Sequence, residues 1–261
     1  MPVQKSIGPF IAAVPLNEIV IEEEVGPRHR NHQHQLAESI EMLSPDKISH
    51  MFHCAAHDEQ YNRRGLFLWE KEAIERYFIG RKHLLLIGAG GGREVIALSR
   101  LGYEVDGYEC HPQLVEAARN LLVKENLSAQ IQIAPRDQCP DGNKVYDGLI
   151  VGWGAYMLIQ GRQHRIDFLR QLRSRAKESS PVLLSFYDRD FDTRRFKIIK
   201  FIGNVLRRMT GGEQMELGDD LFPNYVHYFI RDEVESELRA GGFDLKFYST
   251  KSYGHAVGFA I

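Results

Sequence analysis

One stretch of the sequence, His83 to Glu109, constrains the fold more than any other. It begins with the apolar run 84–87 and continues through a turn with glycine at positions 88, 90, 91 and 92, a helical segment and a second strand pattern. A short apolar run bounded by glycine is typical of a strand buried on both faces of a parallel sheet. The glycines let a ligand approach the backbone, and the following helix directs its free N–H groups and positive dipole end to the same place.

A carboxylate ends the second strand of this stretch. Glu109 lies 21 residues after Gly88, a spacing that suits an acidic side chain accepting hydrogen bonds from ribose hydroxyls beside a glycine turn. The stretch therefore predicts a site for a ligand that contains a nucleoside. Dinucleotides and S-adenosylmethionine both satisfy this requirement.

The composition permits a sizeable core and gives no global argument for a charged partner. The chain has 261 residues, of which 43% are hydrophobic, so one elaborated α/β domain is the simplest partition. Lysine and arginine number 33 and aspartate and glutamate 35, which gives a net charge of −2. A chain this close to balance does not by itself point to nucleic acid or to a membrane surface.

Cysteine usage and the N-terminus predict a cytoplasmic protein. Three cysteines, Cys54, Cys110 and Cys139, are too few and too scattered for a disulfide framework, and free thiols fit a reducing compartment. Pro9 and Pro15 interrupt the early apolar run, which argues against a signal peptide. No stretch approaches the roughly 20 apolar residues that span a bilayer, so no stable membrane insertion is expected.

Residues 1–80 are predicted to form an N-terminal arm and a helical cap. Three histidines occur within 29–34, and one face of the predicted helix 47–57 carries three histidines and a cysteine. Either group could be a ligand cluster, but no recognised zinc spacing is present. A polar, solvated helix start is the favoured interpretation for 29–34, and packing with hydrogen bonding is favoured for 47–57, so no metal is predicted. Residues 65–78 show helical periodicity and are expected to help close the ligand site.

From residue 81 onward, strand and helix patterns alternate, and two strand patterns joined by a short turn end the chain. Alternation predicts a parallel sheet with helices on both faces, and a closing hairpin makes the last strand antiparallel to its neighbour. The predicted fold is α/β: a Rossmann-like, seven-stranded, mostly parallel sheet with a C-terminal antiparallel hairpin, an N-terminal helical extension and an insertion after the fifth strand. The predicted domains are 1–80 and 81–261. The predicted strands cover 84–87, 105–109, 130–134, 145–151, 182–187, 243–250 and 255–261.

The insertion, residues 188–228, shows no strand pattern and is predicted to cap the domain. Within it, the pattern over 191–209 predicts a helix that carries six cations together with apolar side chains. Such a helix could lie on a membrane surface or steer an anionic substrate. Its apolar and basic positions interleave irregularly, which favours a cap helix packed on the domain with solvated basic edges.

From about residue 66 to residue 261, the chain resembles the class I S-adenosylmethionine-dependent methyltransferases. The likeness rests on LLLIGAGGGRE, on the acidic strand end GYECHPQLVEAAR, on APRDQ after the third strand and on VYDGLIVGWGAYM at the fourth. Two departures from a dinucleotide site agree with it. Arg93 stands where the dinucleotide fingerprint has a small residue for close helix–strand packing, and the predicted sheet ends in an antiparallel hairpin.

The resemblance implies a binding site for S-adenosylmethionine as the cofactor. It implies that the glycine turn packs on the methionine moiety and ribose, that Glu109 holds the ribose hydroxyls and that Asp137 contacts the adenine amino group. The family often has a carboxylate just before or early in the glycine turn, where this chain has Ile87 and Ala89. Contacts to the methionine amine are therefore expected from elsewhere. The predicted cofactor-binding residues are Gly88, Ala89, Gly90, Gly91, Glu109, Cys110, Asp137, Gln138, Gly152 and Trp153.

Methyl transfer from a sulfonium is an in-line displacement, in which positioning and desolvation can supply much of the catalysis. A general base is required only for an acceptor that is protonated at the working pH. The acceptor pocket is expected beyond the carboxyl ends of the fourth and fifth strands, where His227 is the candidate base and Tyr156 a second candidate catalytic residue. A role for His227 in structuring the roof of the pocket is the alternative. Further candidates for this pocket are Tyr187, Asp188, Tyr225 and Tyr228.

The end of the fourth strand restricts the acceptor. Residues 152–156 read Gly-Trp-Gly-Ala-Tyr, whereas relatives that methylate exocyclic base amines carry an Asp/Asn-Pro-Pro-aromatic run there and cytosine C5 chemistry uses a Pro-Cys pair. A small-molecule acceptor, methylated at oxygen or nitrogen, is therefore predicted, with no nucleic-acid partner. The alternatives are an NAD(P)-dependent oxidoreductase and a non-catalytic S-adenosylmethionine-binding module that engages a partner or a membrane through 191–209.

Overall fold

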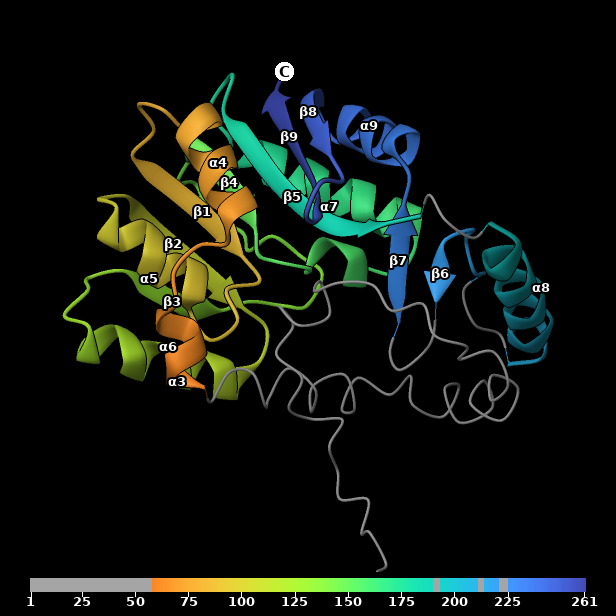
Figure 1. Cartoon of the computed structure of the whole chain (residues 1–261), viewed down its shortest axis with the longest axis horizontal. Coiled ribbons are helices and arrows are strands. Elements are labelled where there is room, and N and C mark those ends of the chain that lie inside the picture. The colour runs from red at the N-terminus through yellow and green to blue at the C-terminus, as the bar shows by residue number, and fades with distance from the viewer. Residues whose placement is uncertain (1–57, 190–192, 211–213, 221–224) are drawn as a thin grey trace, which may run out of the picture.

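The computed structural model describes residues 58–189, 193–210, 214–220 and 225–261. The two histidine-rich segments within 1–57, and the arm to which they belong, lie outside the described residues. Figure 1 shows a central sheet crossed on both sides by helices. Within the described residues, no helix combines the length and the apolar composition needed to cross a membrane.

Five parallel strands form the centre of the sheet in the order β3-β2-β1-β4-β5. Each is a short apolar or alternating run of the kind that the sequence predicts. The connection from β3 to β4 contains no helix, as its short length indicates. The strands are β1 (His83–Ile87), β2 (Glu104–Glu109), β3 (Gln130–Ile133), β4 (Gly148–Val151) and β5 (Pro181–Asp188).

The C-terminal hairpin closes one side of the sheet. Strand β9 (Gly254–Ala260) runs antiparallel to β5, and β8 (Phe243–Ser249) runs antiparallel to β9. In spatial order these seven strands are β3-β2-β1-β4-β5-β9-β8, and they confirm the predicted Rossmann-like sheet with its antiparallel end.

Two further strands lie where the sequence shows no strand pattern, and here the prediction was wrong. Strand β7 (Val226–Phe229) pairs in parallel with the end of β5, and β6 (Asp219–Asp220) pairs antiparallel with β7. The buried positions of β7 are His227 and Phe229. Because a polar histidine occupies one inward position, the hydrophobic alternation that marks a strand is hidden.

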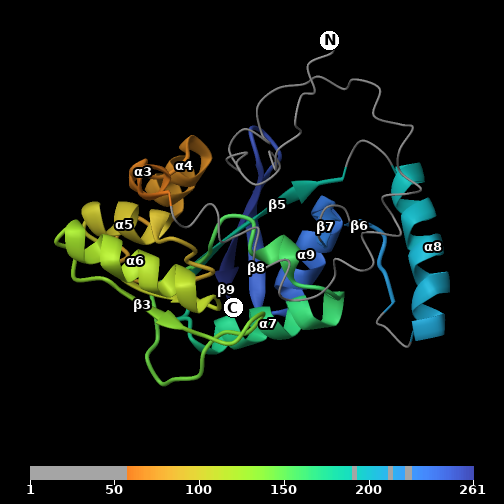
Figure 2. The same cartoon turned by 90° about the horizontal axis from the view of Figure 1, so that it is seen from below.

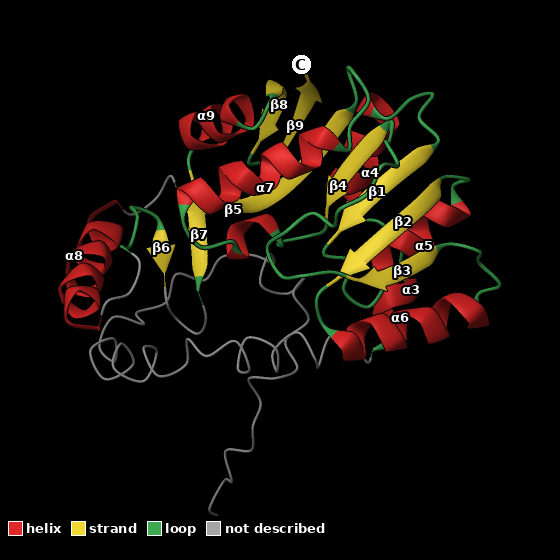
Figure 3. Cartoon of the chain, turned by 180° about the vertical axis from the view of Figure 1, so that it is seen from behind, coloured by secondary structure: helices red, strands yellow, loops and turns green. Residues whose placement is uncertain are grey.

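Helices cover both faces of the sheet, and the side chains of β1 alternate between them. Leu84 and Leu86 belong to one apolar cluster with side chains of α4, α5 and α6, whereas Leu85 and Ile87 belong to a second cluster with side chains of α7 and α9. Figure 3 shows α7 and α9 in front of the sheet when it is seen from behind. The helices are α4 (Leu68–Tyr77), α5 (Arg93–Arg100), α6 (Pro112–Lys124), α7 (Arg162–Ser174) and α9 (Arg231–Ala240).

Two other helices flank this core. Helix α3 (Glu59–Arg63) precedes α4 and lies over α5. Helix α8 (Thr193–Thr210) confirms the helix predicted within the insertion and packs on β6 at the edge of the molecule, where Figures 1 and 2 show it as the outermost element. From β1 the chain adds β2 and β3 toward one edge of the sheet, and it then returns to add β4 and β5 on the other side of β1. At such a switch point a crevice opens at the carboxyl ends of the strands.

Candidate functional site

A cavity opens at the carboxyl ends of β1, β2 and β4. The turn after β1, the end of β2, the loop after β3 and the segment after β4 all contribute to its wall, and α3 contributes from the N-terminal side. The polar and glycine residues of the wall are Tyr61, Asn62, Gly88, Gly90, Gly91, Arg93, Glu94, Tyr108, Glu109, Cys110, His111, Arg136, Asp137 and Trp153.

Glu109 holds the glycine turn against the end of β2. Its Oε2 accepts a hydrogen bond from the amide of Gly90 at 2.8 Å, and its Oε1 accepts from the amides of Cys110 at 2.7 Å and His111 at 3.0 Å. The side chain is only 6% exposed. An ionised carboxylate offers about four acceptor positions, so Oε2 keeps room for a further donor from a ligand.

Glycine is required at two points of close backbone approach. Gly88 has a φ of +78°, and a Cβ at Gly152 would lie 2.1 Å from the carbonyl oxygen of Gly88. The turn after β1 and the residue after β4 therefore touch backbone to backbone. At Gly91 the space of a Cβ is filled by the side chain of Asn62, so α3 closes directly over the glycine turn.

Arg93 joins the N-terminal helices to the cavity wall. Its guanidinium donates to both oxygens of Glu70 at 2.6 and 2.7 Å, and to Oε1 of Glu94 at 2.7 Å. The same Oε1 accepts from the amide of Trp153 at 3.0 Å, and the guanidinium lies 4.0 Å from the ring centre of Phe67. Burial raises the pKa of Glu70, and the charge of Arg93 opposes that shift. The residue that departs from a dinucleotide fingerprint thus anchors α4 to α5.

The cavity has more carboxylates than cations to neutralise them. Arg93 is shared between two carboxylates, and Arg136 lies 3.7 Å from Asp137. Glu109 receives only backbone N–H groups in the hydrogen bonds above. Burial and the neighbouring Glu109 raise the pKa of the Cys110 thiol to about 12. The wall therefore favours a ligand with hydroxyl groups and positive charge over an anionic ligand.

Most of the predicted cofactor-binding residues meet at this cavity. Gln138 and Gly152 do not line it: Gln138 is exposed, and Gly152 lies behind the turn against Gly88. Those that do are Gly88, Ala89, Gly90, Gly91, Glu109, Cys110, Asp137 and Trp153.

Sequence reasoning missed several polar residues of the wall, among them Tyr61, Asn62 and Glu94. Glu94 had a readable signal, because a carboxylate in the first turn of a helix that follows a glycine turn faces the same ligand as the turn. Tyr61 and Asn62 had none, since only the packing of α3 over the turn brings them there.

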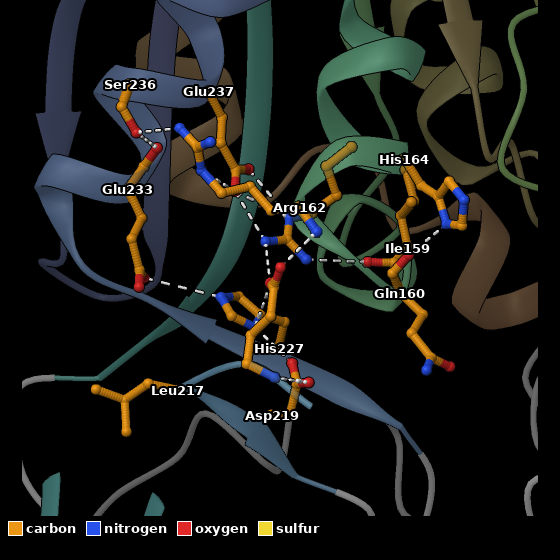
Figure 4. A network of polar contacts seen from close by, with 12 residues as sticks. Ile159, Gln160, Arg162, His164, Leu217, Asp219, His227, Glu233, Ser236 and Glu237 are labelled. Atoms are coloured by element: carbon orange, nitrogen blue, oxygen red, sulfur yellow. Dashed lines mark hydrogen bonds and ion pairs between the residues drawn. The ribbon is translucent and has the colours of Figure 1, made fainter. Parts of the chain in front are cut away.

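The two predicted catalytic residues, Tyr156 and His227, do not line the cavity. Tyr156 lies in a 3₁₀ turn (Tyr156–Leu158), is fully buried and donates to Oε2 of Glu237 at 2.6 Å. Nδ1 of His227 lies 2.7 Å from Oδ1 of Asp219, and its Nε2 lies 3.8 Å from Oε2 of Glu233. Figure 4 shows His227 between these two carboxylates.

The pKa shifts of both residues oppose a role as a base. Burial and the carboxylate of Glu237 raise the pKa of the Tyr156 phenol well above its usual value. Burial disfavours a charged imidazole at His227, but the contacts with Asp219 and Glu233 outweigh it and raise the pKa. A raised pKa favours the protonated imidazole, which is the form that cannot accept a proton, and His227 lies outside the cavity wall.

Arg165 lies at the centre of the same network. It is 1% exposed and donates to Glu237 at 2.8 Å and to Glu216 at 2.7 Å, so it links α7 to α9 and to the segment before β6. One of its two partners, Glu216, lies with Asp219 and His227 at the spacing of metal ligands. Arg162 and Arg165 are thus both engaged in contacts within the protein. The ionisable groups of the network are Arg162, Arg165, Arg189, Glu216, Asp219, His227, Glu233 and Glu237.

Comparisons with solved structures identify the fold. A methyltransferase that uses S-adenosylmethionine, from Methanosarcina mazei, aligns with a TM-score of 0.59 at 14% identity, over 76% of this chain and 99% of its own. An amino pentose methyltransferase of calicheamicin biosynthesis from Micromonospora echinaspora, with S-adenosylmethionine bound, gives 0.56 at 14% identity over 78% and 96%. An O-methyltransferase family protein from Burkholderia thailandensis gives 0.58 at 10% identity over 87% and 68%.

No family model matches the sequence. A search of curated proteins also finds no match. The structural alignments nevertheless show that this chain has the Rossmann-like fold of the class I S-adenosylmethionine-dependent methyltransferases, as its resemblance to them implies.

Proposed function

We propose that the protein is an S-adenosylmethionine-dependent methyltransferase that acts on oxygen or nitrogen of a small molecule. The observation that carries this proposal is the buried Glu109 carboxylate, which is bonded to the amide of Gly90 at the mouth of a glycine turn and points into the cavity wall. A carboxylate at this position accepts ribose hydroxyls. Oε2 of Glu109 is the oxygen with acceptor capacity to spare.

Glu94 supports a cationic ligand beside the ribose position. The carboxylate that such glycine turns often carry is absent, because Ile87 and Ala89 occupy its place. Glu94 lines the same cavity, is 7% exposed and shares its arginine with Glu70. We assign to Glu94 the contact with the positively charged methionine end of the cofactor. When bound, S-adenosylmethionine supplies an electrophilic methyl group on a sulfonium.

The same contacts oppose a nicotinamide dinucleotide. A pyrophosphate at a glycine turn needs backbone N–H groups at the helix start, but the amide of Gly90 already donates to Glu109. Glu94 and Glu109 would repel the phosphates at short range. Arg93 could not compensate, because its guanidinium is held between two carboxylates.

The acceptor site belongs beyond the end of β4, where Trp153 and Ala155 line the cavity. The part of this chain in the reaction is to orient the two reactants and exclude water. In this scheme Tyr156 and His227 stabilise the structure around the site through their contacts with carboxylates, and neither acts as a general base. The amino pentose and O-methyltransferase neighbours support a small acceptor with a nitrogen or oxygen nucleophile.

Calorimetric titration with S-adenosylmethionine, S-adenosylhomocysteine and NADH tests the proposal. Binding of the first two and not of NADH is expected. Methyl transfer from labelled S-adenosylmethionine is then measured on a panel of amines, hydroxy acids and phenols. Tight binding of NADH alone contradicts the cofactor assignment, and activity confined to RNA or protein contradicts the acceptor class.

A further inference from the structure

Helix α8 carries two apolar faces, and within the described part of the chain one of them packs on the domain while the other stays exposed. The inner face buries Phe196, whose ring centre lies 5.2 Å from that of Tyr228, and places Ile199 against Met215. Asn204 adds hydrogen bonds of 2.6 and 3.2 Å to the backbone of Met215. These contacts fix the helix on the domain and determine which side chains point away from it.

The outer face is an exposed apolar stripe. Ile198, Phe201, Ile202 and Val205 follow one another at the i, i+3, i+4 and i+7 positions that share a helix face, with Phe201 72% exposed. Among the described residues, eleven large apolar side chains are exposed, and four of them form this stripe. A continuous apolar patch on an otherwise polar surface marks an interaction site.

Cations border the stripe. The sequence of α8 contains six arginines and lysines and no acidic residue, although the whole chain has a net charge of −2. Arg195 pairs with Asp220. Arg194, Lys197 and Arg208 are exposed at positions that adjoin the stripe, and Lys200 is exposed on another side of the helix. The partner of this face must therefore offer both apolar contact and negative charge.

We propose that α8 docks the protein reversibly on an anionic lipid surface. A helix with an aromatic and aliphatic stripe bordered by lysine and arginine places the stripe at the boundary of headgroups and acyl chains, while its cations contact the anionic headgroups. Figure 2 shows α8 as an outer element with the other labelled helices and strands on one side of it, as such docking requires. A second copy of the chain fits less well, because symmetric pairing of the stripes would bring one set of cations against the other.

Sedimentation of the full chain with lipid vesicles tests this proposal. Binding to phosphatidylcholine vesicles that contain phosphatidylserine, weakened by added salt, is expected, with little binding to phosphatidylcholine alone. Phe201→Ser, and separately the double change Arg194→Gln and Lys197→Gln, should each weaken binding by about tenfold or more. The matched control is Val123→Ser, which removes an equally exposed apolar side chain from α6 and should leave binding unchanged.

Three outcomes overturn the proposal. One is equal binding of Phe201→Ser and the unchanged chain. Another is the absence of vesicle binding together with a dimer that Phe201→Ser dissociates, which identifies a second copy as the occupant. In the last, the protein is a monomer that does not bind vesicles, and its α8 is protected from hydrogen exchange until residues 1–57 are removed. That result identifies the chain's own N-terminal part as the cover of the stripe.

Discussion

Nη2 of Arg93 lies 2.7 Å from Oε1 of Glu94, although the same guanidinium already holds both oxygens of Glu70. One cation thus serves two buried carboxylates, of which only Glu94 lines the cavity. The pair Glu70 and Glu94 offers a matched comparison, because each can be neutralised while Arg93 keeps one carboxylate partner.

Glu94→Gln is expected to weaken S-adenosylmethionine binding by about tenfold or more, since a hydrogen bond to a charged group contributes about 1.5–3 kcal/mol. Glu70→Gln should leave the dissociation constant nearly unchanged. Each substitution removes one charged carboxylate partner of Arg93, so each should lower the free energy of unfolding by about 1–3 kcal/mol. Calorimetry and urea unfolding measure the two effects. Equal loss of affinity in both variants would show that Glu94 acts only through Arg93.

Glu109→Gln keeps the size of the side chain and removes its charge. The amides of Gly90, Cys110 and His111 all donate to this carboxylate, and the glutamine amide can accept with only one oxygen. We expect at least a tenfold increase in the dissociation constant of S-adenosylhomocysteine, roughly 1.4 kcal/mol. Glu104→Gln, an exposed change at the other end of β2, is the control. Undiminished affinity in Glu109→Gln would remove this residue from the ligand site.

Gly152→Ala tests the backbone contact behind the cavity. The added Cβ would lie 2.1 Å from the carbonyl oxygen of Gly88, so the turn must move, and overpacking of this kind costs about 1–3 kcal/mol of unfolding free energy. In Gly91→Ala the atoms nearest the added Cβ belong to a side chain, that of Asn62, and not to the backbone, and the change should destabilise less. Denaturant unfolding of both variants measures the difference. A reversed order would mean that α3 is held over the turn more firmly than the backbone itself.

The parts of the fold that the sequence predicts are those set by local pattern. The run 84–87, the glycines after it and Glu109 lie within one stretch of chain, so their spacing alone indicates a strand, a turn and a ribose-binding carboxylate. The closing hairpin is equally local. These elements agree with the structure to within a few residues.

Features created by contacts between distant segments could not be predicted in this way. Strand β7 escaped detection because His227 fills an inward position, where Asp219 and Glu233 lie beside its imidazole. Asn62 reaches the cavity because Arg93 and Glu70 fasten the N-terminal helices to α5. In both cases a buried charge pair, invisible to hydrophobic periodicity, determines the arrangement.

The stability of the protein should depend on the protonation of His227. Burial lowers the pKa of His227, but its contacts with Asp219 and Glu233 outweigh burial and raise that pKa in the folded protein. Burial raises the pKa of Asp219, but the hydrogen bond with His227 outweighs burial and lowers that pKa. The imidazolium also balances a network in which carboxylates outnumber arginines. Its other charged neighbours are Arg165, Arg189 and Glu216.

The direction of the pH dependence follows from these shifts. A raised folded pKa means that the contribution of His227 is complete below the unfolded value of about 6.5 and is lost as the pH rises through the folded value, by at most about 1.4 kcal/mol per pH unit. The lowered pKa of Asp219 gives a contribution that is present above about 3.9 and is lost as the pH falls through the folded value. Urea unfolding across the neutral and mildly alkaline range should therefore show declining stability. In His227→Gln the alkaline decline should disappear, whereas His164→Gln, an exposed histidine on α7, should retain it. A flat profile in the unchanged chain would mean that His227 is neutral in the folded protein.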